Sequence, residues 1–97
     1  MSRERKKSQE HNREVRREAK KLERQGWNVE ADLPEYDTPE PIGKGGHIPD
    51  VVAKKRGATR IIEVDTPGNE DPKQLAAFRR SAGQKKRTTF QHIMTDK

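Results

Sequence analysis

Three carboxylates lie in the one stretch where β-branched apolar residues cluster, residues 48–66. They are Asp50, Glu63 and Asp65. The polar dipeptide Arg56-Gly57 separates two apolar runs and suits a tight turn, so the stretch predicts a β-hairpin. A two-residue loop pairs Asp50 with Glu63, and directly opposed like charges are destabilising unless something neutralises them. A divalent cation does so, because hard cations take carboxylate oxygens as ligands.

Strand alternation extends this patch and predicts where the core lies. Asp65 falls on the same strand face as Glu63, which makes three carboxylates on one surface. The opposite face carries Val51, Ile62 and Val64. The register of the hairpin decides whether the carboxylates lie together, because a three-residue loop would place Val51 opposite Glu63 and separate them.

The same hairpin carries a family resemblance. Pro49-Asp50, a turn and then Ile61-Ile62-Glu63-Val64-Asp65 resemble the PD-(D/E)xK nuclease superfamily, in particular its Holliday-junction-resolvase-like members, which share a Gly-rich lead-in. The resemblance covers roughly residues 43–78 and a first helix.

This resemblance implies that Asp50 and Glu63 hold Mg²⁺ or Mn²⁺ where phosphodiesters are cleaved, with Asp65 as a third candidate ligand. A lysine two residues after the Glu assists the water in that family, and here Asp65 occupies that position. The implied function is metal-dependent cleavage of nucleic acid, with branched or structured DNA as one substrate. The alternative is a nuclease-fold protein that does not cut and binds nucleic acid or a protein partner through basic residues.

A first helix is predicted over residues 9–25, which are rich in good helix formers and precede Gly26. Its apolar stripe consists of His11, Val15, Ala19 and Leu22. Members of the resembled family often bring an acidic side chain from this helix to the metal, which makes Glu18 a further catalytic candidate and Glu14 the second choice. The alternative for both is a surface Glu paired with a nearby Lys or Arg.

A strand is predicted over residues 27–33, where apolar and polar residues alternate. Trp27 shares the apolar phase and is therefore interpreted as a core anchor. Residues 34–46 are rich in Pro and Gly and predict a long loop that could bring Lys44 near a bound phosphate.

The hairpin strands are predicted at 47–54 and 59–66. A second helix over 72–82 has Pro72 at its first position, is capped by Asp71 and is ended by Gly83. A last strand over 88–94 is expected to run parallel to the strand at 59–66. The order is helix, three strands, helix, strand, an α/β class bordering on α+β. It matches the restriction-endonuclease-like core, a small mixed sheet flanked by helices.

The composition predicts one small domain. The chain has 97 residues, of which 27% are hydrophobic, so a large core is excluded. Residues 1–8 are expected to form a disordered basic arm and 9–97 a single nuclease-like domain. No cysteine and no long apolar run are present, which favours a soluble cytoplasmic protein without a membrane span. The small core and a role on duplexes favour a homodimer.

The net charge of +6 alternates by segment, with basic stretches interrupted by acidic ones. An enzyme that acts on a polyanion needs cations to hold phosphates and carboxylates to hold metal. The predicted nucleic-acid-binding residues, with DNA as the expected partner, are Lys44, Arg79, Arg80, Lys85, Lys86 and Arg87. The alternative is that these charges are simply solvated.

Overall fold

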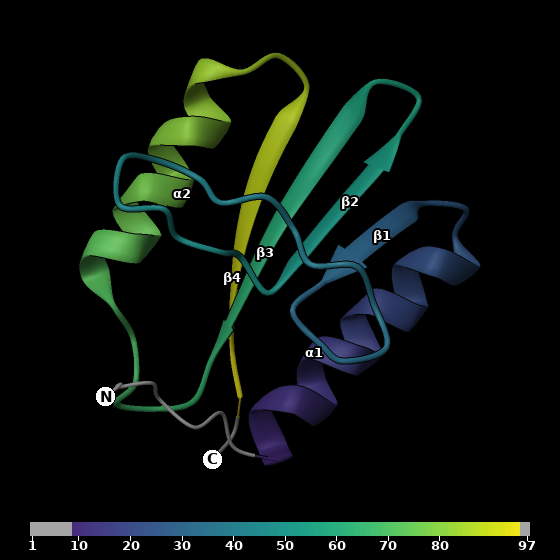
Figure 1. Ribbon diagram of the computed structural model, residues 1–97, viewed down its shortest axis with the longest axis horizontal. Coiled ribbons are helices and arrows are strands. Elements are labelled where there is room, and N and C mark those ends of the chain that lie inside the picture. The colour runs from purple at the N-terminus through teal and green to yellow at the C-terminus, as the bar shows by residue number, and fades with distance from the viewer. Residues whose placement is uncertain (1–8, 96–97) are drawn as a thin grey trace.

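The computed structural model describes residues 9–95, which form a small α+β domain (Figure 1). Its elements are α1 (Gln9–Arg24), β1 (Asn28–Ala31), β2 (Val51–Lys55), β3 (Ala58–Asp65), α2 (Pro72–Gln84) and β4 (Thr88–Met94). The predicted order of elements is confirmed. The basic arm predicted for residues 1–8 lies outside the described residues. No helix within residues 9–95 is long and apolar enough to cross a bilayer.

The four strands form one mixed sheet in the order β1-β2-β3-β4. β2 is antiparallel to β1 and β3, whereas β3 and β4 are parallel, as predicted for a strand, helix and strand unit. Lys55 pairs with Ala58 and Val51 with Ile62, so the loop of the hairpin has two residues. The register on which the carboxylate patch depends is therefore confirmed.

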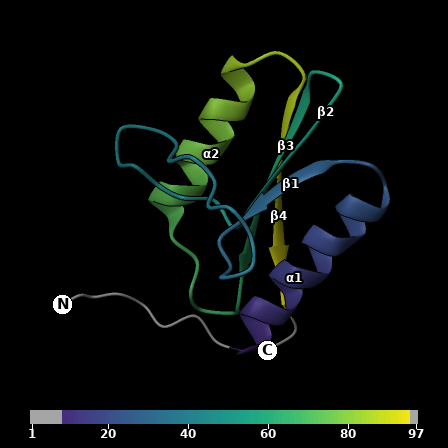
Figure 2. The same cartoon turned by 45° about the vertical axis from the view of Figure 1, so that its right-hand side comes forward.

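The two helices cover opposite faces of the sheet. α1 packs on β1, β2 and β3, and α2 packs on β3 and β4. Figure 2 shows the strands β2 to β4 nearly edge-on, with α2 on one side and α1 on the other. Alternation along β3 explains this, because Ile62 faces α1 while Ile61 faces the side of Phe90 and Phe78, whose ring centroids are 5.8 Å apart.

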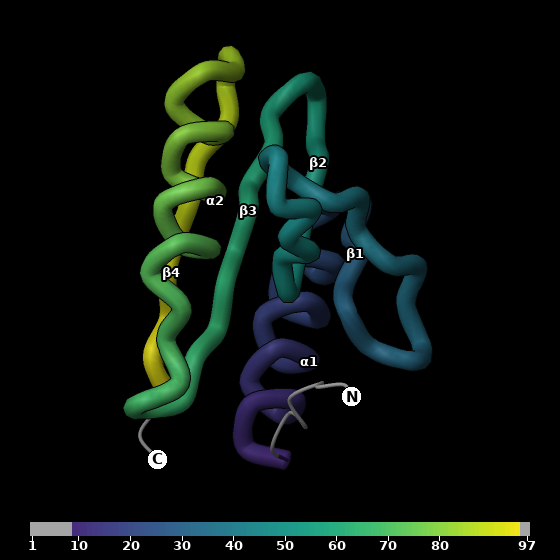
Figure 3. Tube along the Cα trace, turned by 60° about the vertical axis from the view of Figure 1, so that its left-hand side comes forward, coloured from purple at the N-terminus to yellow at the C-terminus, as the bar shows by residue number. Residues whose placement is uncertain are grey.

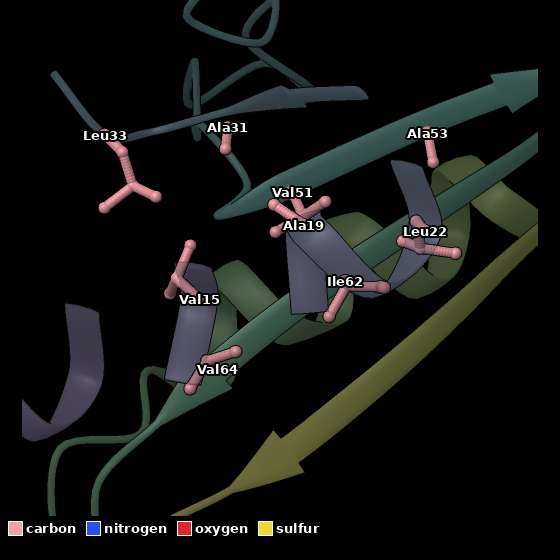
Figure 4. Close-up of a cluster of buried hydrophobic side chains, with 9 residues drawn as sticks. All are labelled: Val15, Ala19, Leu22, Ala31, Leu33, Val51, Ala53, Ile62 and Val64. Carbon is pink, nitrogen blue, oxygen red and sulfur yellow. The ribbon is translucent and has the colours of Figure 1, made fainter. Parts of the chain in front are cut away.

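The main core lies between α1 and the sheet (Figure 4). It contains small and β-branched side chains almost throughout: Val15, Ala19, Leu22, Ala31, Leu33, Val51, Ala53, Ile62 and Val64. The stripe predicted on the first helix and the apolar hairpin face predicted from alternation therefore meet as expected. Trp27 packs against this cluster from the connection that follows α1, and it is only partly buried.

The chain makes a long excursion between β1 and β2 (Figure 3). The strand predicted over 27–33 is shorter than expected, because after Ala31 the backbone turns, with Tyr36 N–H donating to Leu33 O at 3.1 Å. The strand predicted over 47–54 begins later, at Val51, since His47 instead forms a bridge with Ile42. Asp50 consequently lies just before β2.

Helix α2 begins as predicted and ends later. Asp71 accepts hydrogen bonds from Lys73 N at 3.1 Å and Gln74 N at 3.3 Å, which confirms the cap. Gly83 was predicted to end the helix, and this is wrong: the helix runs to Gln84, and Lys85 then takes an extended conformation. A glycine costs helix stability without forbidding the helical conformation, so one in the last turn is tolerated.

A matched pair of substitutions tests the core. Ile62 is 1% exposed and Ile48 is 36% exposed. We expect Ile62→Val to lower the free energy of unfolding by about 1 kcal/mol, because it removes a buried methylene and leaves a cavity. We expect Ile48→Val to change it by less than about 0.5 kcal/mol. Urea unfolding measures both, and equal effects would show that the α1 face of β3 is not the core.

Candidate active site

Asp50 is fully buried and holds the open end of the hairpin together. Its Oδ2 accepts a hydrogen bond from Val64 N–H at 2.9 Å, and its own N–H donates to Glu63 Oε1 at 3.2 Å. Its carbonyl oxygen accepts from Asp32 N–H at 2.9 Å, on the side of β1. The pairing of β2 with β3 is thus continued past Val51 by carboxylates, which brings Asp50 and Glu63 into direct contact.

A histidine from α1 contacts the Asp50 carboxylate. His11 Nε2 lies 3.2 Å from Asp50 Oδ2, and His11 as a whole residue is 6% exposed. A carboxylate has no proton to donate, so the imidazole nitrogen that faces an ionised Asp50 carries the proton. The first turn of α1 is therefore tied to the end of the hairpin by a polar contact between buried side chains.

The third carboxylate forms a second acid–imidazole pair. Asp65 is 8% exposed, and its Oδ2 lies 2.9 Å from His92 Nε2. His92 comes from β4, where it is the register partner of Glu63, itself 3% exposed. Glu63 and two acid–imidazole pairs therefore lie at one end of the sheet, on residues that are mostly buried.

Neither histidine was identified as a site residue from the sequence. His11 was assigned to the apolar stripe of the first helix, and its spacing agrees with that position. His92 was placed on the last strand, but its pairing with Glu63 depends on the offset between two parallel strands joined by a helix. Alternation gives the face of a strand and not this offset, so the sequence holds no local signal for the contact.

Glu18 and Glu14 contact each other on α1. Glu18 is 9% exposed, and its carboxylate lies 3.9 Å from Lys21 Nζ. Burial raises the pKa of Glu14 above its ordinary value of 4.5, and its hydrogen bond to Glu18 adds to the effect, while Arg17 at 3.2 Å opposes it. The described partners of Glu18 thus belong to its own helix, but Glu18 is buried and not on the helix surface.

The carboxylates form pairs rather than one cluster. Within residues 9–95, no three side chains of His, Asp or Glu are arranged so that they could hold a metal ion together. Glu63 is engaged by the backbone of Asp50, and Asp65 by His92. The oxygens suit Mg²⁺ or Mn²⁺ in type, but a shared ion requires these side chains to change partners.

The predicted phosphate-binding cations are all exposed, and none of them lies on a strand. Lys85, Lys86 and Arg87 precede β4, which begins alongside Thr59, whereas the carboxylates lie near the far end of β3. Arg79 stacks its guanidinium 5.5 Å from the Phe90 ring centroid. Lys44 is in the long loop, whose Gly43 lies against Ala77 of α2.

Comparison with known proteins adds no assignment: no protein-family model matches the chain, and no curated protein matches it in sequence. The site is therefore interpreted from its own geometry.

The hydrogen bond from Val64 predicts a difference between two substitutions of Asp50. Asp50→Ala leaves a buried N–H without its acceptor, so we expect the free energy of unfolding to fall by about 2 kcal/mol. Asp50→Asn retains an acceptor oxygen and should cost clearly less. Urea unfolding at pH 7 measures both, with Asp37→Ala at an exposed carboxylate as the control. Equal losses for Ala and Asn would contradict this role of the side chain.

The raised pKa of Glu14 predicts a pH dependence. A carboxyl whose pKa is higher in the folded state contributes stability below its unfolded pKa, and that contribution is lost as the pH rises through the folded pKa. We expect Glu14→Gln to remove this loss. The difference in unfolding free energy between wild type and variant, measured from pH 4 to pH 7, should therefore move against the wild type with rising pH. A flat or opposite trend would show that Glu14 is not protonated preferentially in the folded chain.

Proposed function

We propose that this chain is a metal-dependent nuclease of the PD-(D/E)xK type, with Asp50 and Glu63 binding Mg²⁺ or Mn²⁺ and nucleic acid as the substrate. The observation that carries the proposal is the burial of opposed carboxylates at one end of the sheet, where Asp50 is 0% and Glu63 3% exposed. The order of elements and the mixed sheet agree with the restriction-endonuclease-like fold.

Stability alone does not account for this arrangement. Burying a charge costs free energy even when the charge is paired. Replacing a buried ion pair by apolar residues of similar size often leaves the stability of a protein unchanged or raises it. The domain has a small core, yet it buries Asp50, Glu63 and Asp65 within one stretch of hairpin. Buried ionisable groups with specific charged partners cluster at functional sites.

The proposed chemistry follows from the acid side chains. A divalent cation held by Asp50 and Glu63 lowers the pKa of a bound water and offsets the charge that develops on the phosphate. To reach such an ion, Glu63 would have to release the amide of Asp50. Asp65 is the proposed third ligand, and Glu18 the proposed acid from the first helix. Asp65 also replaces the motif lysine, so activation of the water rests on the metal.

One observation favours a second function, nucleic-acid binding without cleavage. Asp65 stands at the position of the lysine, and both acid pairs are already satisfied by protein groups. In this second function the hairpin carboxylates only stabilise the fold, and the exposed cations bind the nucleic acid. The partner proposed in either case is DNA. A homodimer is also proposed, since Ile48 and Met94 are exposed apolar side chains of the described region.

One cleavage experiment separates these functions. We expect the protein to cut DNA only with Mg²⁺ or Mn²⁺, and Asp50→Asn and Glu63→Gln each to lower the rate by about a hundredfold or more, because each removes a charged ligand. The substrates are linear duplex, four-way junction and single-stranded DNA, together with duplex RNA. Glu40→Gln is the control, since it removes an exposed carboxylate from the long loop.

The other outcomes are equally specific. Binding that weakens steeply with salt, without cutting under any metal, supports the second function. Cutting that persists in both site variants would show that the hairpin carboxylates are not the catalytic residues. A protein that neither binds nor cuts these substrates has neither function.

A further inference from the structure

A contiguous group of cations lies at the end of the sheet opposite Asp50. We call it the turn ridge, and it consists of Lys55, Arg56, Arg60, Lys85, Lys86 and Arg87. It joins the loop of the hairpin to the connection between α2 and β4: Arg87 donates from its guanidinium to Arg56 O at 3.0 Å, and Thr59 N–H donates to Arg87 O at 2.8 Å. Two segments distant in sequence therefore present their charges side by side.

The flank of the turn ridge is organised around Trp27. Lys55 Nζ lies 5.6 Å and the Arg60 guanidinium 5.7 Å from the centroid of its ring. Cations over an aromatic face are held in place without losing their charge. A groove beside them is lined by Trp27, Arg60, Arg87 and Gln91, and the Arg60 guanidinium donates to Gln91 Oε1 at 3.2 Å.

None of the cations of the turn ridge forms a salt bridge within residues 9–95. The ion pairs of that part of the chain involve α1, the loop after β1 and the two histidines of the site. Among the described residues these six cations therefore have no carboxylate partner, although Lys55 Nζ donates to Gln25 O at 2.6 Å. Such a concentration repels itself, so an external polyanion is the complementary partner.

The backbone supplies an independent observation. Arg56 and Arg87 have φ values of 50° and 55°, and they are the non-glycine residues with positive φ in the described chain. This conformation costs an ordinary residue about 1 to 2 kcal/mol, and a hairpin turn with two positive φ values favours Asn-Gly over Arg-Gly. Both strained positions hold arginine and both belong to the turn ridge. Backbone strain of this kind persists at functional sites.

We propose that the turn ridge binds the phosphodiester backbone of a nucleic-acid duplex. Guanidinium groups match phosphate oxygens through paired N–H donors, and a row of cations follows a row of phosphates. A membrane surface fits less well, because binding to lipid also uses exposed apolar side chains. Those of the described region, Ile48 and Met94, lie near the carboxylate end of the sheet.

The distance between the turn ridge and the carboxylate end of the sheet gives the length of duplex that could contact both. The proposal rests on the second proposed function, nucleic-acid binding, and deepens it by naming the binding surface and a duplex as the ligand. Binding here needs neither metal nor cutting. From Ala58 to Asp65 the strand β3 spans seven steps of about 3.3 Å, or about 23 Å. At 3.4 Å per base pair, a duplex that contacts both ends of the sheet covers about seven base pairs.

The test exploits the strained arginines. Arg56→Asn removes a charge and places at the turn a residue that tolerates positive φ, so we expect the melting temperature to stay or rise while DNA binding weakens. The affinity for a 20-base-pair duplex in EDTA at 50 mM salt should fall about tenfold, and the slope of log K against log salt should shrink by about 0.9. Lys85→Gln/Lys86→Gln, without any change at a strained position, should lower the affinity at least as much.

Arg13→Gln is the control, since it removes an exposed charge from α1 and leaves the turn ridge intact. The proposal is overturned if Arg56→Asn and the double lysine variant bind the duplex as tightly as wild type, or if Arg13→Gln weakens binding equally. It is also overturned if the turn ridge variants lose affinity for phosphatidylserine vesicles and not for DNA. Since EDTA prevents metal-dependent cleavage, failure of the nuclease proposal and failure of this one are observed separately.

Discussion

The hydrogen bond from Val64 N–H to the Asp50 carboxylate is the contact on which the proposed active site depends. It continues the pairing of β2 with β3 beyond the last ladder pair, Val51 with Ile62. The two-residue turn sets the register, and this bond carries it to the end of the sheet where the acids lie. Together with the hydrogen bonds of Asp50 to Glu63 and Asp32, it fixes the geometry of the acid pair.

The two ends of the hairpin have opposite character. One end holds buried carboxylates balanced by backbone N–H groups and imidazoles, and the other holds cations that form no salt bridge within residues 9–95. The sheet separates these charges, so neither group neutralises the other. The proposed functions use this division, since the cations would hold phosphates and the carboxylates would hold a metal.

The parts of the fold that could be predicted are those fixed by local chemistry. Arg56-Gly57 determined the hairpin, Asp71 the start of α2, and alternation the faces of β3. The parts that could not be predicted depend on distant contacts. The offset of β4 against β3, which brings His92 to Asp65, is set by packing, and the early end of β1 is set by the loop that follows it.

The link between His11 and Asp50 has a consequence for motion. His11 sits in the first turn of α1, and helix ends open more readily than helix centres. When that turn unwinds, the imidazole leaves the carboxylate while Val15, Ala19 and Leu22 keep the rest of the helix docked. Local opening of this turn would therefore change the electrostatic environment of Asp50 without global unfolding.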